Sequence, residues 1–115
     1  MAECVVVGQQ LVVRMNTREK LEAVHADVSV PLSSVRSVEV VENTFDFVHG
    51  LRVGTGIPGS TAIGTFTSST ARIFGVIHHG KHRGLRILLE GADFDEILIG
   101  CDDPEAVAAA IPVSP

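Results

Sequence analysis

The second half of the chain is a series of four β-prone runs of strand length, each separated from the next by turn residues. The runs are Thr61 to Phe66, Arg72 to His78, Gly84 to Leu89 and Phe94 to Gly100. Ser/Thr, Gly-Lys-His-Arg-Gly and Gly-Ala-Asp segments lie between them, and these residue types favour tight turns. The pattern predicts four consecutive strands arranged as a meander.

The N-terminal part combines a predicted hairpin with a short helix. Cys4 to Val7 and Leu11 to Met15 are two apolar runs around a Gly-Gln-Gln turn, which predicts a β-hairpin. Asn16 and Glu19 have the spacing of a capping box, in which the N-cap side chain and the third helical residue satisfy each other's backbone N–H groups. We therefore expect a single helical turn over Thr17 to Glu22.

Two further strands are predicted before an irregular segment. Val24 to Val30 alternates apolar and polar residues up to Pro31, as in a half-buried strand. Val35 to Val41 also alternates, but apolar residues fall on both faces, which predicts a β-bulge or a change of the inward side. From 43 to 59 the pattern becomes rich in Gly and Asn and predicts a loop, within which Leu51-Arg52-Val53 could form a very short strand.

The C-terminus carries the signals of one short helix. Asp103 is a suitable N-cap, Pro104 a suitable first helical residue, and Ala106 to Ile111 continues the helix until Pro112 ends it. The order of elements predicts a mainly β fold of about seven antiparallel strands, as a barrel or two packed sheets, closed by this helix.

Composition limits the class of protein. A chain of 115 residues with 45% hydrophobic residues is long enough to bury one core, so we expect a single domain over 1–115. The net charge of −5 disfavours binding to nucleic acid and to an anionic membrane surface. No run approaches the about 20 apolar residues of a transmembrane helix. The first eight residues lack a signal-peptide pattern, so we expect a cytoplasmic protein.

Two segments resemble a known family. The run Val28-Ser29-Val30-Pro31-Leu32-Ser33-Ser34-Val35-Arg36-Ser37-Val38 is similar to the strand, turn and strand of bacterial pleckstrin-homology-like proteins. The helix start Asp102-Asp103-Pro104-Glu105 also fits that family, and the resemblance extends over essentially the whole chain. It implies a binding scaffold, but it assigns no ligand and no catalytic residues.

Residues 43–59 are the preferred binding surface. Phe45 and Phe47, followed by His49, form an apolar patch suited to a protein interface if they are exposed. The alternative is that this segment folds back and buries them. A protein partner or a second copy of the chain, held by this segment and by an exposed strand edge, is the first functional hypothesis.

The glycines of the same segment suggest a second hypothesis. Gly54, Thr55 and Gly56 could present backbone N–H groups to an anionic ligand, with Arg52 and the Thr55 hydroxyl adding hydrogen bonds. The segment lacks the ending of a phosphate-binding P-loop, and a tight turn leading into a bulged edge strand is the favoured explanation of the glycines.

The remaining chemistry-bearing residues give no catalytic constellation, so we expect neither an enzyme nor a cofactor. His78, His79 and His82 are close in sequence, but adjacent strand residues point to opposite faces, and we interpret this segment as a solvated turn rather than a metal site. Cys4 and Cys101 lie in apolar runs and are expected to be buried free thiols.

Overall fold

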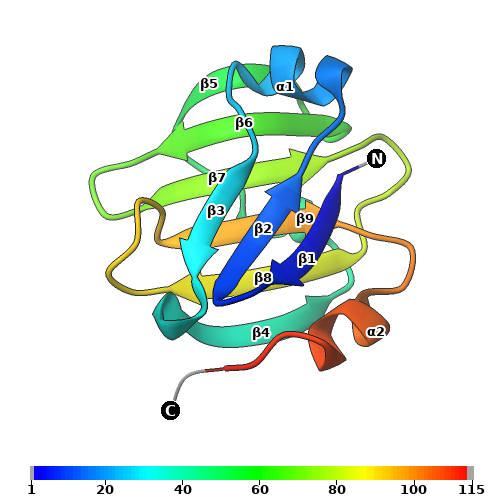
Figure 1. The fold of residues 1–115 in the computed structure, drawn as a ribbon. Coiled ribbons are helices and arrows are strands. Elements are labelled where there is room, and N and C mark those ends of the chain that lie inside the picture. Colours follow the sequence, from blue (N-terminus) through cyan, green and yellow to red (C-terminus); the bar gives the residue numbers. More distant parts are fainter. Residues whose placement is uncertain (1, 114–115) are drawn as a thin grey trace.

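The computed structural model of the protein describes residues 2–113, which form nine strands in two sheets (Figure 1). The smaller sheet has the order β1-β2-β3, and the larger sheet has the order β4-β8-β9-β7-β6-β5. Their bounds are β1 Glu3–Val7, β2 Gln10–Arg14, β3 Val28–Pro31, β4 Val35–Val41, β5 Leu51–Ile57, β6 Thr61–Thr67, β7 Arg72–Ile77, β8 Gly84–Leu89 and β9 Glu96–Gly100. The helical elements are α1 Thr17–Ala23, η1 Leu32–Ser34, η2 Thr44–Phe47 and α2 Pro104–Ala109.

The smaller sheet lies obliquely across one face of the larger sheet, which we call its inner face (Figure 1). Apolar side chains from both sheets form one core between them, including Leu11, Val30, Ile63, Phe74 and Ile97. The opposite, outer face of the larger sheet carries a second apolar cluster. This outer-face cluster comprises Ala62, Phe66, Ile73, Ile77 and Leu98. The central strands of the larger sheet are therefore buried on both faces.

The N-terminal hairpin and the predicted capping box are confirmed. β1 and β2 pair antiparallel from Glu3↔Arg14 to Val7↔Gln10. The Asn16 side chain accepts from the Glu19 N–H at 2.8 Å, and a Glu19 carboxylate oxygen accepts from the Asn16 N–H at 3.0 Å. This reciprocal cap starts α1, which continues to Ala23, one residue beyond the predicted end.

The strand predicted from Val24 is wrong over its first four residues. Val24 takes the left-handed conformation, with φ of 53°, and its N–H donates to carbonyl oxygens of the last helical turn. The chain therefore turns at the end of α1, and the strand begins only at Val28. β3 ends at Pro31, as predicted, and Pro31 itself is the last paired residue, which an edge strand tolerates because it needs no N–H there.

The four strands of the second half exist, but their meander is wrong. β9 lies between β7 and β8, pairing parallel with β7 and antiparallel with β8. Alternation determines which residues face the core, but it does not determine which strand becomes the neighbour. In the part of the chain that the structure describes, β4 and β5 are the two open ends of the larger sheet, and the sheet does not close into a barrel.

The bulge and the C-terminal helix are found, although the helix ends at Ala109, two residues before the predicted end. The register of β4 with β8 shifts between Val35 and Ser37. Asp103 caps α2 by accepting from the Ala106 N–H at 3.2 Å, and Ile111 is buried just beyond the helix. α2 lies beside β4 (Figure 1). Neither helix within residues 2–113 has the length and apolar character needed to cross a membrane.

Candidate functional site

The turn η2, Thr44–Phe47, is attached to the β7–β8 connection. The Thr44 N–H and hydroxyl both donate to the His82 carbonyl oxygen, at 2.8 and 2.6 Å. The Phe45 ring lies 5.1 Å from the His82 ring, measured between centroids. The Asn43 side chain accepts from the Phe45 N–H at 3.1 Å and caps the turn. These contacts hold the segment against the β7–β8 connection, so it is not an open loop.

Phe45 and Phe47 are half-buried and pack on the outer-face cluster. The Arg86 guanidinium lies over the Phe47 ring, 4.4 Å from its centroid. The two side chains thus complete the second apolar cluster, which is the folded-back alternative considered from the sequence. Only His49, among the predicted site residues before β5, is exposed.

Residues 51–57, predicted to be mostly loop, form the full seven-residue strand β5. β5 pairs antiparallel with β6 from Leu51↔Thr67 to Ile57↔Thr61, without a register shift. The glycines hid this strand in the sequence because they interrupt the apolar alternation. Gly54 has a φ of 138° and lies opposite Gly64, whose φ is 142°. A Cβ on Gly54 would lie 2.1 Å from the Ile63 carbonyl oxygen. Close approach of two strands thus accounts for this glycine.

The structure does not bring Arg52 and Thr55 together. Successive strand residues point to opposite faces, and the contacts of β5 follow this rule. The Thr55 hydroxyl donates to the Glu22 carbonyl oxygen of α1 at 2.9 Å, on the inner face. The Arg52 side chain lies over Gly56 on the same strand, where a Cβ would be 2.5 Å from a guanidinium nitrogen. Arg52 and Thr55 therefore cannot converge on one anion.

The most exposed apolar side chains gather around β5 and α1, which lie at the same end of the larger sheet (Figure 1). We call these five residues the β5 edge patch. Their exposed fractions are 83% for Leu51, 57% for Val53, 56% for Ile57, 75% for Leu21 and 69% for Val24. Leu51, Val53 and Ile57 alternate with Arg52, Gly54 and Gly56, so they share the inner face with Thr55.

Two of the other sheet edges, β4 and β3, carry protective features that β5 lacks. Charged side chains, bulges, prolines and covering helices are the usual devices that prevent an edge strand from pairing with another chain. β4 carries Arg36 and Glu39, contains the bulge and is accompanied by α2. β3 has four residues and includes Pro31. β5 is a seven-residue edge whose only charged residue is Arg52.

Beside β5, the inner face holds a pair that sequence reasoning missed. His78 Nε2 lies 2.7 Å from a Glu19 carboxylate oxygen, and Glu19 is only 1% exposed. The pair lines a pocket of about 460 Å³ together with Thr55, Thr61 and His79. The two residues are 59 positions apart in sequence, and the residues next to His78 give no signal of its partner. The capping box had indicated a role for Glu19, but only within α1.

The Glu19 carboxylate is held in its ionised form. Burial raises the pKa of Glu19, but the Asn16 backbone N–H and the His78 side chain donate hydrogen bonds that lower the pKa below its usual value. An ionised carboxylate can only accept hydrogen bonds. His78 Nε2 is therefore the donor, and the interpretation of His78 as part of a solvated turn is wrong. The pair connects α1 to the end of β7.

The other two histidines of this turn have separate partners. His79 Nδ1 lies 2.7 Å from the Ser60 hydroxyl, and His82 Nε2 lies 2.7 Å from the Ser60 carbonyl oxygen. Among residues 2–113, His, Cys, Asp and Glu side chains form no group of three that could hold a metal ion. The three histidines thus have separate roles: His79 and His82 join the β7–β8 connection to the β5–β6 connection, and His78 contacts α1.

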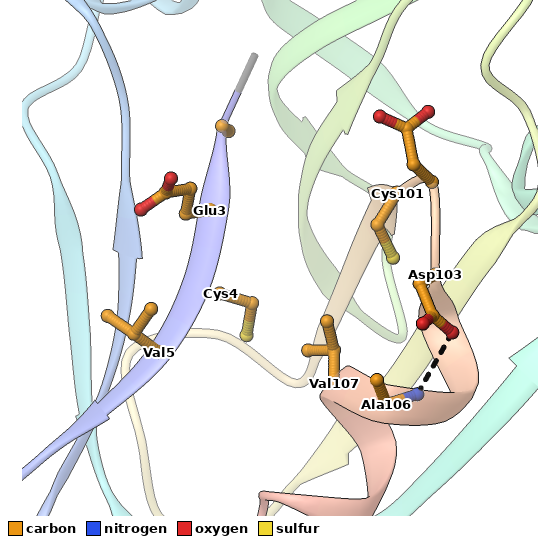
Figure 2. A pocket seen from close by; sticks show the side chains of 9 residues that line it. Glu3, Cys4, Val5, Cys101, Asp103, Ala106 and Val107 are labelled. Atoms are coloured by element: carbon orange, nitrogen blue, oxygen red, sulfur yellow. Dashed lines mark hydrogen bonds between the residues drawn. The ribbon is translucent and has the colours of Figure 1, made fainter.

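A second pocket, of about 500 Å³, lies between β1 and the start of α2 (Figure 2). Cys4 and Cys101 both line it, and both are free thiols. Burial, aided by the neighbouring Cys101, raises the pKa of Cys4 to about 12. Burial and then Asp102 raise the pKa of Cys101 to about 11. Neither thiol is ionised near neutral pH, which removes the thiolate needed for nucleophilic chemistry.

Comparisons of the chain with family models, with curated proteins and with solved structures found no match.

Proposed function

We propose that this protein is a non-enzymatic interaction module that binds an extended protein segment along the outer edge of β5. The observation that carries the proposal is the β5 edge itself, a seven-residue strand that pairs on one side only and bears three exposed apolar side chains. An added strand would hydrogen-bond to the open backbone groups, and its alternate side chains would contact the β5 edge patch.

Energetics favour this use of the edge over solvent exposure. Burying one Val, Leu or Ile side chain fully contributes about 1.5–3 kcal/mol. The β5 edge patch offers five such side chains. Ordering of the bound segment offsets part of this gain, so an affinity in the micromolar range is a reasonable expectation. The main-chain hydrogen bonds supply binding, and the patch supplies selectivity for apolar residues at alternate positions.

The setting of this function is proposed from the sequence alone. A bacterial, cytoplasmic protein with a scaffold of the pleckstrin-homology-like type remains our proposal for the context in which the module acts.

We favour binding over catalysis because Glu19, the buried carboxylate of the pocket, also caps α1. Its hydrogen bonds therefore have a structural use.

A peptide selection tests the proposal. Random nonapeptides displayed on phage are selected on the wild type, and the selected peptides are then measured on Val53→Lys, which places a charge on the edge. Val113→Lys, at another exposed valine, is the matched control for the added charge. We expect enrichment of peptides with apolar residues at alternate positions, which shift the backbone amide resonances of β5 and bind Val113→Lys normally. Selected peptides that bind Val53→Lys equally well, or that shift other amides, would overturn the proposal.

A further inference from the structure

We propose that the strand added to β5 is β5 of a second copy, paired antiparallel about a two-fold axis through Gly54. This inference rests on the proposed function of the β5 edge, and it names the partner. The dimer would join two six-stranded sheets edge to edge into one continuous sheet. Such an interface is isologous, so the same patch must be complementary to itself.

The residue order of β5 meets this requirement. Pairing about Gly54 uses all seven residues, whereas a shift by two residues leaves either Leu51 or Ile57 opposite a polar or unpaired position. A shift by one residue would place each apolar side chain on the wrong face. The favoured register pairs Leu51 with Ile57, Arg52 with Gly56, Val53 with Thr55 and Gly54 with itself.

Charge also permits this register. Like charges directly opposite each other destabilise a strand pair. Arg52 is the only charged residue of β5, and it would face Gly56 of the second copy. The two Arg52 residues would begin four positions apart, about 13 Å along the strands at about 3.3 Å per residue. This separation exceeds the Debye length of about 8 Å at physiological salt.

α1 provides an independent argument. Val24 is the only non-glycine residue with a positive φ in the part of the chain that the structure describes. A β-branched residue is strained in this conformation, and Gly or Asn is the usual choice at the end of a helix. Its side chain is mostly exposed and adds little to the core of the single copy. A strained, exposed valine at this position is explained if its side chain contacts a partner.

The position of α1 relative to the axis supports that explanation. The hydrogen bond from the Thr55 hydroxyl to the Glu22 carbonyl places α1 over a residue adjacent to Gly54. Leu21 precedes Glu22 in sequence, Val24 lies two residues beyond it, and both side chains are exposed. In the proposed dimer, Val53 of the second copy lies opposite Thr55. Leu21 and Val24 would then cover the junction between the two strands.

Two measurements test the dimer. Light scattering after size exclusion, from micromolar to millimolar protein, should give a dimer mass for the wild type and for Val113→Lys, and a monomer mass for Val53→Lys. For the register, Leu51→Cys protein is mixed with Ile57→Cys protein under mild oxidation. We expect more mixed disulfide from this pair than from Leu51→Cys with Val53→Cys, and none from the wild type, whose thiols are half-buried.

The outcomes separate the dimer from the wider proposal. A wild type that stays monomeric at millimolar concentration would overturn the dimer, while selected peptides that bind β5 would still support the interaction module. A dimer mass for Val53→Lys would also overturn the proposed pairing. So would equal yields of mixed disulfide from Leu51→Cys with Ile57→Cys and from Leu51→Cys with Val53→Cys. Circular dichroism of each variant would show that it keeps the fold.

Discussion

Nε2 of His78 lies 2.7 Å from the carboxylate of Glu19, and this contact joins the end of β7 to the first turn of α1. The same carboxylate accepts the Asn16 N–H and so starts the helix. One buried group therefore serves both local and long-range structure. α1 in turn holds β5 through the bond from Thr55 to Glu22. The stability of the Glu19–His78 contact should consequently influence the order of the β5 edge.

Replacement of Glu19 by Gln should separate the charge of this group from its capping function. The Gln amide oxygen can still accept the Asn16 N–H, but the charge-assisted bond to His78 is lost. Hydrogen bonds to charged groups contribute about 1.5–3 kcal/mol, so we expect a loss of that order in the free energy of unfolding, measured by urea denaturation. Glu3→Gln, at an exposed residue, is the matched control and should change little. Equal stability of both variants would contradict a stabilising role for the pair.

Acid should weaken the fold through the same residue. The pKa of Glu19 is lowered in the folded protein, so this carboxylate stabilises the fold above its unfolded-state pKa of about 4.3. That stabilisation is lost as the pH falls through the lower, folded-state pKa. The pKa of Glu105 is also lowered, by hydrogen bonds from Arg83, so the wild type alone does not isolate Glu19. We expect the stability difference between wild type and Glu19→Gln to shrink below about pH 4. A difference that stays constant down to pH 2 would refute this linkage.

Gly54→Ala should be strongly destabilising. Its Cβ would lie 2.1 Å from the Ile63 carbonyl oxygen, and its φ of 138° is unfavourable for alanine. Left-handed strain costs about 1–2 kcal/mol, and overpacking adds about 1–3 kcal/mol. Gly80→Ala separates these effects, because Gly80 has a φ of 75° with open space around it. Thermal unfolding should show a much larger loss for Gly54→Ala, and similar losses would argue against close strand approach.

Those glycines also show where sequence reasoning ends. The hairpin, both helix caps and the bulge of β4 were predictable because each depends on residues close together in the chain. β5 was not predictable, because Gly54 and Gly56 have no side chains to continue the alternation. Gly54 is required by the close approach of Gly64 on the neighbouring strand, and Gly56 leaves room for the Arg52 side chain of the same strand. The exposed edge that carries the proposed function lay inside the segment singled out from the sequence.

Long-range partners escaped prediction for the same physical reason. The parallel pairing of β7 with β9 and the pairing of His78 with Glu19 join residues that are distant in sequence. Alternation and capping patterns contain no information on such contacts. The burial of Phe45 and Phe47 likewise depends on a sheet face whose existence only the assembled strands reveal.

The two thiols should react slowly with thiol-specific reagents. An ordinary cysteine has a pKa of about 8.5, whereas the pKa of Cys4 is raised to about 12 and that of Cys101 to about 11. The thiolate fraction at pH 7 is then at least about 100-fold lower than that of a free cysteine. The folded protein should react with a disulfide reagent more slowly than glutathione by this factor. In urea, which unfolds the protein, its rate should match that of glutathione. Fast labelling of the folded protein would contradict the raised pKa values of the two thiols that line the pocket in Figure 2.

Val24→Gly should move stability and self-association in opposite directions. Glycine adopts a positive φ without steric strain, so it relieves the left-handed conformation that Val24 holds at the end of α1. The free energy of unfolding of the single copy should stay equal or rise by up to about 1 kcal/mol. Self-association should weaken several-fold, because an exposed apolar contact of the β5 edge patch is removed. Urea denaturation at low concentration and sedimentation equilibrium measure the two quantities separately. Val113→Gly, which also removes an exposed valine side chain, should leave the association unchanged. Loss of stability without weaker association would mean that Val24 serves the fold of the single copy, and the argument from its strain would fail.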